Sequence, residues 1–299
     1  MRQKEIQIEM NYPFQKVYGT IYEPETVVGS LILVHDLHEH RQRYQRLIRY
    51  YYDLGIAVLS YDLRGSRTSL IHQKEGNLGS KEELLDDLEK MIKLLKKQYE
   101  LLPLTVLGIG FGANLSLVLG KEKPELIDRL VLVSPVAKPR ASTVKWLLLK
   151  AISLKWSNQY FKQLWPTHLN IKINPAQKYD KWEYLSLDEK VIQSYHLDPL
   201  CGRFLTNGSL ETVIKLVNSS YQALSQKIPL YKKVLVIGGK EDPLTRQSLS
   251  LIQLKQLLMN WGFELEDVLI FSNYRHDVLY DFQENEVLLT SLTKFLLNH

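Results

Sequence analysis

The sequence predicts an α/β protein with a mostly parallel central sheet flanked by helices, interrupted once by a helical insertion. Short apolar runs such as Ser30–Asp36 and Ile56–Asp62 are typical of strands buried on both faces. Longer helical patterns alternate with these runs, which indicates right-handed crossovers between parallel strands. A turn with glycine at every second position, GIGFG at 108–112, separates one apolar run from a helix of small and apolar residues.

Size and composition fit one large domain. The chain has 299 residues, of which 45% are hydrophobic and 24% charged, as in ordinary soluble globular proteins. It contains no apolar run of about 18 residues that would span a bilayer, and no apolar segment of a secretory signal follows Met1. We therefore expect a cytoplasmic protein. The single cysteine, Cys201, excludes an internal disulfide and predicts a buried thiol.

The first half of the chain follows the alternation closely. Its opening residues alternate apolar and polar side chains, which predicts an antiparallel hairpin at a sheet edge. Ser80 and Glu83 form a capping-box pattern that starts a helix. The expected elements are a hairpin over 1–22, a strand over 30–36, a helix over 41–54, a strand over 56–62, a helix over 80–99, a strand and helix over 104–119, and a strand over 130–136.

The alternation stops after residue 136 and resumes near residue 209. We expect a helical cap over 137–208, inserted into an α/β core made of residues 1–136 and 209–299. The core elements expected after the cap are a helix over 210–224, a strand over 232–239, a helix over 246–261, a strand over 267–271 and a helix over 284–297.

The glycine-rich turn carries the strongest functional signal. A strand, a tight turn and a buried helix form the nucleophile elbow G-x-S-x-G, which lifts one side chain above the carboxyl edge of a parallel sheet. In this chain the central position is Gly110, which has no side chain. The motif therefore predicts the fold, while the attacking hydroxyl of the usual chemistry is missing.

Two later loops fit the remaining positions of an acyl-transfer triad. Such a triad needs a nucleophile, a base that deprotonates it and an acid that orients the base. With this fold they follow the order nucleophile, acid, base, each after a strand. Asp242 lies in GKEDP just after one strand, and His276 lies in YRHD just after the last strand. We predict Asp242 as the carboxylate and His276 as the imidazole.

Three motifs together resemble the monoacylglycerol lipase and lysophospholipase family of α/β-hydrolases, close to the bacterial serine aminopeptidase-like hydrolases. That family has H-G-x-x-E-H-x-x-R-Y after a strand, and this chain has HDLHEHRQRY from His35 to Tyr44. YDLRG at 61–65 is similar to the family's D-x-R-G-H-G loop, and DPLCG at 198–202 is like a segment of bacterial members. The resemblance covers nearly the whole chain. It implies hydrolysis of monoacylglycerols, lysophospholipids and related esters, a small lipid-like or acyl ester ligand, and no cofactor.

The departures from the family pattern affect the chemistry directly. Gly110 stands at the nucleophile serine, and Asp36 replaces the glycine beside the oxyanion hole. By resemblance, the oxyanion donors are the backbone N–H groups of Leu37 and Phe111. His35 and Asp36 are expected to belong to the same oxyanion or binding site. A carboxylate at Asp36 near this hole would oppose the negative charge that develops in the transition state. We therefore predict a pseudoenzyme with lost or strongly reduced serine-hydrolase activity.

The sequence leaves several alternatives open. A serine knockout made in the laboratory would explain Gly110, but not Asp36 or the serine at position 66 of the D-x-R-G-H-G-like loop. Ser134 and Ser116 are candidates for a relocated nucleophile, although neither lies at the tip of the turn. Asp36 with His276 could also activate water directly.

Metal binding is not expected. The cluster of His35, His38, Glu39 and His40 does not have the spacing of H-E-x-x-H or H-x-x-E-H, and the family resemblance accounts for three of its members.

The predicted cap has an unusual composition. It holds four of the five tryptophans, Trp146, Trp156, Trp165 and Trp182, and the stretch from Lys138 to Tyr179 has eight basic residues and no acidic one. These aromatic residues either pack on the core, or they form with the lysines a surface that meets anionic lipid or roofs an acyl pocket. Nucleic-acid binding is not expected, because no reader motif accompanies the basic residues.

Overall fold

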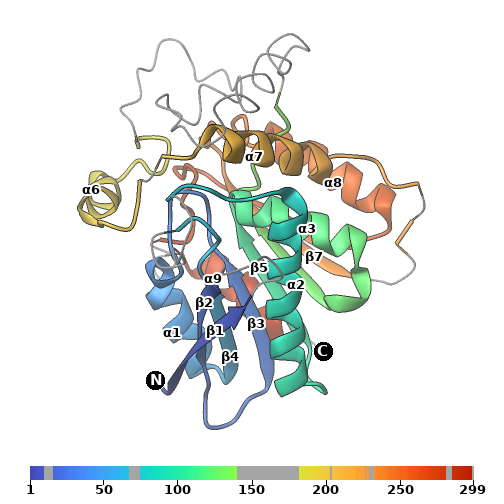
Figure 1. Ribbon diagram of the computed structural model, residues 1–299. Coiled ribbons are helices and arrows are strands. Elements are labelled where there is room, and N and C mark those ends of the chain that lie inside the picture. Colours follow the sequence, from blue (N-terminus) through green and yellow to red (C-terminus); the bar gives the residue numbers. More distant parts are fainter. Residues whose placement is uncertain are drawn as a thin grey trace.

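The computed structural model describes residues 1–9, 16–66, 75–139, 182–202, 204–225, 227–228, 232–280 and 285–297. Its strands form one sheet in the order β1-β2-β4-β3-β5-β6-β7-β8 (Figure 1). Their bounds are β1 Gln3–Glu9, β2 Lys16–Tyr22, β3 Gly29–Val34, β4 Ile56–Tyr61, β5 Leu104–Ile109, β6 Arg129–Val133, β7 Lys233–Gly239 and β8 Glu264–Phe271.

Strand directions confirm a mostly parallel sheet with an antiparallel hairpin at one edge. The pairs β1–β2 and β2–β4 are antiparallel, whereas β3 pairs in parallel with both β4 and β5, and β6, β7 and β8 continue in parallel. The carboxyl ends of the parallel strands meet at one edge, where ligand sites of such sheets form.

Helices cover both faces of the sheet, which gives it two apolar cores (Figure 1). The buried side chains of α2, α3, α7 and α8 belong to one core, and those of α1 and α9 belong to the other. Adjacent residues of β3 alternate between them, since Ile32 lies in the first core and Leu33 in the second. The helix bounds are α1 Gln45–Asp53, α2 Lys81–Gln98, α3 Phe111–Glu122, α6 Glu189–Leu197, α7 Asn207–Ser220, α8 Leu249–Trp261 and α9 Glu286–Leu297, with 3-10 helices η1 Arg41–Tyr44 and η3 Pro124–Leu126.

Several predicted boundaries shift for local reasons. The capping box of Ser80 and Glu83 is present at the start of α2, as the sequence predicts. Helix α8 begins three residues later than expected, because residues 246–248 all have positive φ angles that an α-helix does not allow. Strand β6 ends at Val133 rather than 136, because Ser134 has a φ of 46°.

Most of the predicted cap, including Trp146, Trp156 and Trp165, lies outside the described residues, so its boundaries stay a prediction. Its last part is described. Trp182 is buried and lies 4.9 Å, between ring centroids, from Tyr195 of α6, so this tryptophan packs in the interior. Within the described part of the chain, no helix has the length and apolar character needed to cross a bilayer.

Candidate active site

The strand register places Asp36 beside Gly110. Strands β3 and β5 are parallel neighbours in which Val34 pairs with Gly108. Asp36 and Gly110 each follow two residues later, so the two loops leave the same sheet edge together. A hydrogen bond of 2.6 Å from the backbone N–H of Phe111 to Asp36 Oδ1 joins them.

Gly110 forms the tip of a sharp turn at the start of α3. Its φ of 54° and ψ of −117° lie where a side chain is strained, and glycine adopts these angles without a Cβ penalty. A Cβ at this position would lie within 2.5 Å of Cγ and both carboxylate oxygens of Asp36. The carboxylate of Asp36 therefore fills the space that a side chain at residue 110 would need.

A chain of hydrogen bonds links Asp36, His276 and Asp242. His276 Nε2 lies 3.1 Å from Asp36 Oδ2, and His276 Nδ1 lies 2.9 Å from Asp242 Oδ2. Asp242 Oδ1 accepts a hydrogen bond of 2.8 Å from the backbone N–H of Leu244, which fixes the carboxylate. All three side chains are buried, with residue exposures of 4% for Asp36, 2% for His276 and 0% for Asp242.

This arrangement holds His276 as an imidazolium. Both ring nitrogens face carboxylate oxygens, which accept when ionised, so both nitrogens donate. Burial alone lowers the pKa of His276, but Asp242 and Asp36 oppose this effect and hold the pKa well above its ordinary value. A protonated imidazole is an acid, and it lacks the free nitrogen that a general base needs.

Residues next to Asp36 have fixed positions. His35 Nδ1 donates to the carbonyl oxygen of Asp36 at 2.7 Å, and its Nε2 accepts from the backbone N–H of Leu63 at 3.0 Å. Burial lowers the pKa of His35, which favours this neutral form. Leu37 is buried and, with Asp36, lines a small cavity of about 30 Å³. Of the donors that the resemblance implies, the N–H of Phe111 points at the Asp36 carboxylate.

The two alternative serines point elsewhere. Ser134 Oγ donates to the carbonyl oxygen of His276 at 2.8 Å, and Ser116 Oγ donates to the carbonyl oxygen of Gly112 inside α3. Both hydroxyls therefore support the backbone around the site instead of facing the imidazole ring. Tyr184 also contacts the site, with its ring centroid 5.9 Å from that of His276.

A buried charge cluster includes Asp277, the residue that directly follows His276 in the sequence. The Arg43 guanidinium pairs with Glu39 at 3.0 Å and with Asp277 at 2.6 Å. It lies against the rings of Tyr195 and Tyr280, 4.9 and 4.7 Å from their centroids. Burial raises the pKa of Glu39 to about 8, although Arg43 opposes this shift.

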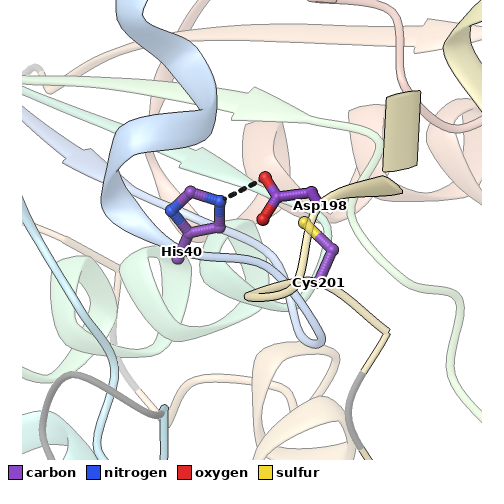
Figure 2. Close-up of side chains that lie close together, drawn as sticks. All are labelled: His40, Asp198 and Cys201. Carbon is purple, nitrogen blue, oxygen red and sulfur yellow. Dashed lines mark hydrogen bonds and ion pairs between the residues drawn. The ribbon is translucent and has the colours of Figure 1, made fainter. Parts of the chain in front are cut away.

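A second cluster joins His40, Asp198 and Cys201, whose candidate ligand atoms lie within 4.8 Å of one another (Figure 2). His40 Nε2 donates to Asp198 Oδ2 at 2.7 Å, and His40 Nδ1 accepts from the backbone N–H of Gln42. Burial raises the pKa of the Cys201 thiol, so it stays protonated and is a poor metal ligand. The cluster fits a hydrogen-bonded link between η1 and the segment after α6 better than a metal centre.

Sequence reasoning missed two features of this site. It did not predict that the Asp36 carboxylate fills the space at Gly110, although both residues lie two positions past the ends of adjacent strands. It also missed the buried cluster around Arg43. The sequence signal for this cluster was Asp277, an acidic residue directly after the predicted catalytic His276.

The parallel sheet, the glycine-rich turn after β5, and an aspartate and a histidine after β7 and β8 together define an α/β-hydrolase. Residues 25–283 match the family model described as serine aminopeptidase, S33. The chain belongs to this family.

Relatives and solved structures agree with the assignment. The chain is 25% identical over 187 residues to the monoglyceride lipase homolog of Monkeypox virus, which covers 58% of this chain and 63% of that protein. The chain thus spans less than two thirds of the viral relative's length. It is 23% identical to the monoacylglycerol lipase of Mycolicibacterium smegmatis over 95% of this chain and 94% of that protein. A thermostable carboxyl esterase from Bacillus coagulans has the same fold, with a TM-score of 0.85, 17% identity and 99% of both chains covered.

The paired imidazolium predicts a specific pH dependence of stability. An unfolded histidine loses its proton near pH 6.5, whereas folded His276 keeps it to higher pH. The contribution of protonated His276 to the free energy of unfolding is therefore complete below about pH 6.5. It declines by up to about 1.4 kcal/mol per pH unit as the pH rises to the pKa of His276 in the folded chain. In Asp36→Asn we expect this decline to end at a lower pH. Urea unfolding of both proteins at intervals from pH 6 to 9 measures it; parallel curves would contradict the ion pair.

Proposed function

We propose that this chain binds a small lipid-like or acyl ester ligand on a monoacylglycerol-lipase scaffold and has lost serine-dependent ester hydrolysis. The observation that carries the proposal is the occupied space at residue 110. The Asp36 carboxylate lies where the nucleophile would stand, and a Cβ there would be within 2.5 Å of its atoms.

Two further contacts support the loss. The Phe111 N–H, an oxyanion donor by resemblance, already donates to Asp36, so it does not await a developing negative charge. His276 is held by two carboxylates and has no free nitrogen with which to deprotonate a hydroxyl. Residue 110 thus has no nucleophilic side chain, and the base and one oxyanion donor are already hydrogen-bonded to carboxylates.

Ester hydrolysis by the purified chain tests the proposal. With short p-nitrophenyl esters and monoacylglycerols as substrates, we expect a kcat at least about 1,000-fold below that of a serine-active relative, since removing the triad serine costs about 10⁶. The M. smegmatis monoacylglycerol lipase is the parallel control. A fluorophosphonate probe should label the control and leave this chain unlabelled. Robust hydrolysis that His276→Ala abolishes would overturn the proposal.

Retained ligand binding is measured separately. A non-hydrolysable ether analogue of a monoacylglycerol should raise the unfolding temperature of this chain in a concentration-dependent way, because a ligand that binds only the folded state stabilises it. No change up to the solubility limit of the analogue would remove the binding half of the proposal and leave the loss of hydrolysis standing.

Two expectations from the sequence stay proposals. One is a peripheral contact between the cap and anionic membranes, which rests on the eight basic residues without an acidic one between Lys138 and Tyr179. The other is a cytoplasmic location.

A further inference from the structure

A polar groove lies at the antiparallel edge of the sheet, away from the chain of Asp36, His276 and Asp242. We call it the edge groove. Its volume of about 540 Å³ is in the range of small-molecule sites, roughly 300–1,000 Å³. Three parts of the chain that are far apart in sequence form it, namely β1 with β2, η1 with α1, and the segment after α6. The described residues that line it are Gln3, Glu5, Tyr22, His40, Gln42, Gln45, Asp198, Pro199 and Leu200.

The lining of the edge groove consists mostly of hydrogen-bonding side chains. Three of these residues, Gln3, Gln42 and Gln45, carry carboxamides, each of which both donates and accepts hydrogen bonds. The carboxylates of Glu5 and Asp198 add acceptors. The groove therefore matches a ligand whose own groups donate as well as accept.

One wall of the groove is held in place by Asp198. Its Oδ2 accepts from His40 Nε2 at 2.7 Å (Figure 2), and its Oδ1 accepts from the backbone N–H of Leu200 at 2.9 Å. Burial raises the pKa of Asp198, but the hydrogen bonds from His40 and Leu200 outweigh this effect and hold the pKa below its ordinary value. The carboxylate therefore stays ionised at neutral pH, and each of its oxygens has a second lone pair for a ligand hydroxyl.

The opposite wall is also fixed by contacts within the protein. Gln45 Nε2 donates to the hydroxyl of Tyr22 at 2.7 Å. Glu5 accepts from Thr20 Oγ1 at 2.7 Å and from the Arg41 guanidinium at 2.9 Å. Side chains that already have their positions lose little freedom when a ligand binds, which favours binding.

The charges of the edge groove select against anionic ligands. Among its described lining residues there is no lysine or arginine. Arg41 lies behind Glu5, where its side chain is 9% exposed and pairs with both Glu5 and Asp62. A phosphate or a carboxylate would therefore meet the negative charge of Asp198 without a cation in the described lining to balance it.

The apolar part of the lining is small. It consists of Pro199 and Leu200, which is too little to cover an acyl chain. It suits the C–H face of a sugar ring, whose hydroxyls can then reach the surrounding carboxamides and carboxylates.

We propose that the edge groove binds a neutral polyhydroxylated ligand of the sugar class. The hydroxyls of the ligand donate to Asp198 and accept from the carboxamides of Gln42 and Gln45. This site is additional to the one in the proposed function and does not depend on it, because its lining includes neither Gly110 nor His276.

A nuclear magnetic resonance titration of the full chain tests the inference. Glucose, maltose and myo-inositol are the sugar and polyol probes, and inorganic phosphate and spermidine are the anionic and cationic probes. We expect saturable shifts of the side-chain amide signals of Gln42 and Gln45 with at least one of the first three probes and none with phosphate. Gln42→Leu should weaken this binding about fivefold, as expected for the loss of one hydrogen bond.

Gln253→Leu is the matched control, because Gln253 is an exposed glutamine of α8 outside the groove. It should leave the affinity unchanged, and unfolding curves show that both variants are folded. The inference is overturned if none of the three neutral probes binds the folded wild-type chain, or if Gln42→Leu binds them as tightly as Gln253→Leu does. Saturable binding of spermidine or phosphate alone at these glutamines would likewise overturn it, since the groove would then select a charged ligand.

Discussion

The double variant Asp36→Gly, Gly110→Ser is expected to hydrolyse esters much faster than the wild-type chain. The serine restores the attacking hydroxyl, and removal of the carboxylate gives that hydroxyl room beside the imidazole of His276. Without Asp36, His276 Nε2 becomes free to accept a proton, and the N–H of Phe111 becomes free to hold an oxyanion. We expect kcat/KM on p-nitrophenyl butyrate to rise at least 100-fold, a small part of the roughly 10⁶ that a triad serine contributes.

The single variants are the informative controls. Gly110→Ser alone should stay inactive and lose stability, because its Cβ meets the Asp36 carboxylate within 2.5 Å. Asp36→Gly alone should stay inactive because it still lacks a nucleophile. A fluorophosphonate probe should label only the double variant. If Gly110→Ser by itself matched the double variant, the Asp36 carboxylate would not block the site as the structure indicates.

Replacing Arg43 with methionine is expected to lower the free energy of unfolding by about 3–5 kcal/mol, because it leaves buried carboxyl groups without their cation. Both Glu39 and Asp277 pair with this guanidinium, whose side chain is only 3% exposed. The substitution also removes the contacts of the guanidinium with Tyr195 and Tyr280. Urea unfolding at pH 7 measures the change.

Arg49→Met is the matched control, on helix α1, which directly follows η1. Arg49 also pairs with an acidic residue, Asp53 at 2.9 Å, but its side chain is 57% exposed. Exposed pairs of this kind contribute little to stability, because water and salt screen the two charges. If the two variants lost equal amounts of unfolding free energy, burial would not explain the strength of the Arg43 cluster.

The sequence predicted the fold well because its signals are local. Continuous apolar runs mark strands buried on both faces, and the Ser80–Glu83 pair marks the start of α2 in the structure. The same local reasoning misplaced the start of α8. Arg246, Gln247 and Ser248 suit a helix by type, yet all three have positive φ angles.

The site was harder to predict because its central fact is a contact between distant loops. The sequence places Asp36 and Gly110 after different strands, and only the pairing of Val34 with Gly108 brings them side by side. The hydrogen bond between Asp36 and His276 spans 240 residues of sequence. No periodicity or spacing reveals that one side chain occupies the volume left by the absence of another.

Mutual exclusion at these two positions has an evolutionary consequence. A serine at residue 110 would leave no room for the Asp36 carboxylate in this arrangement, so aspartate at 36 fits only where residue 110 is glycine. Once aspartate was in place, reversion at residue 110 alone became unfavourable, and the substitution pair acts as a ratchet. The unfolding free energies of the two single variants measure this asymmetry: Gly110→Ser should be less stable than Asp36→Gly, and the reverse order would remove the ratchet.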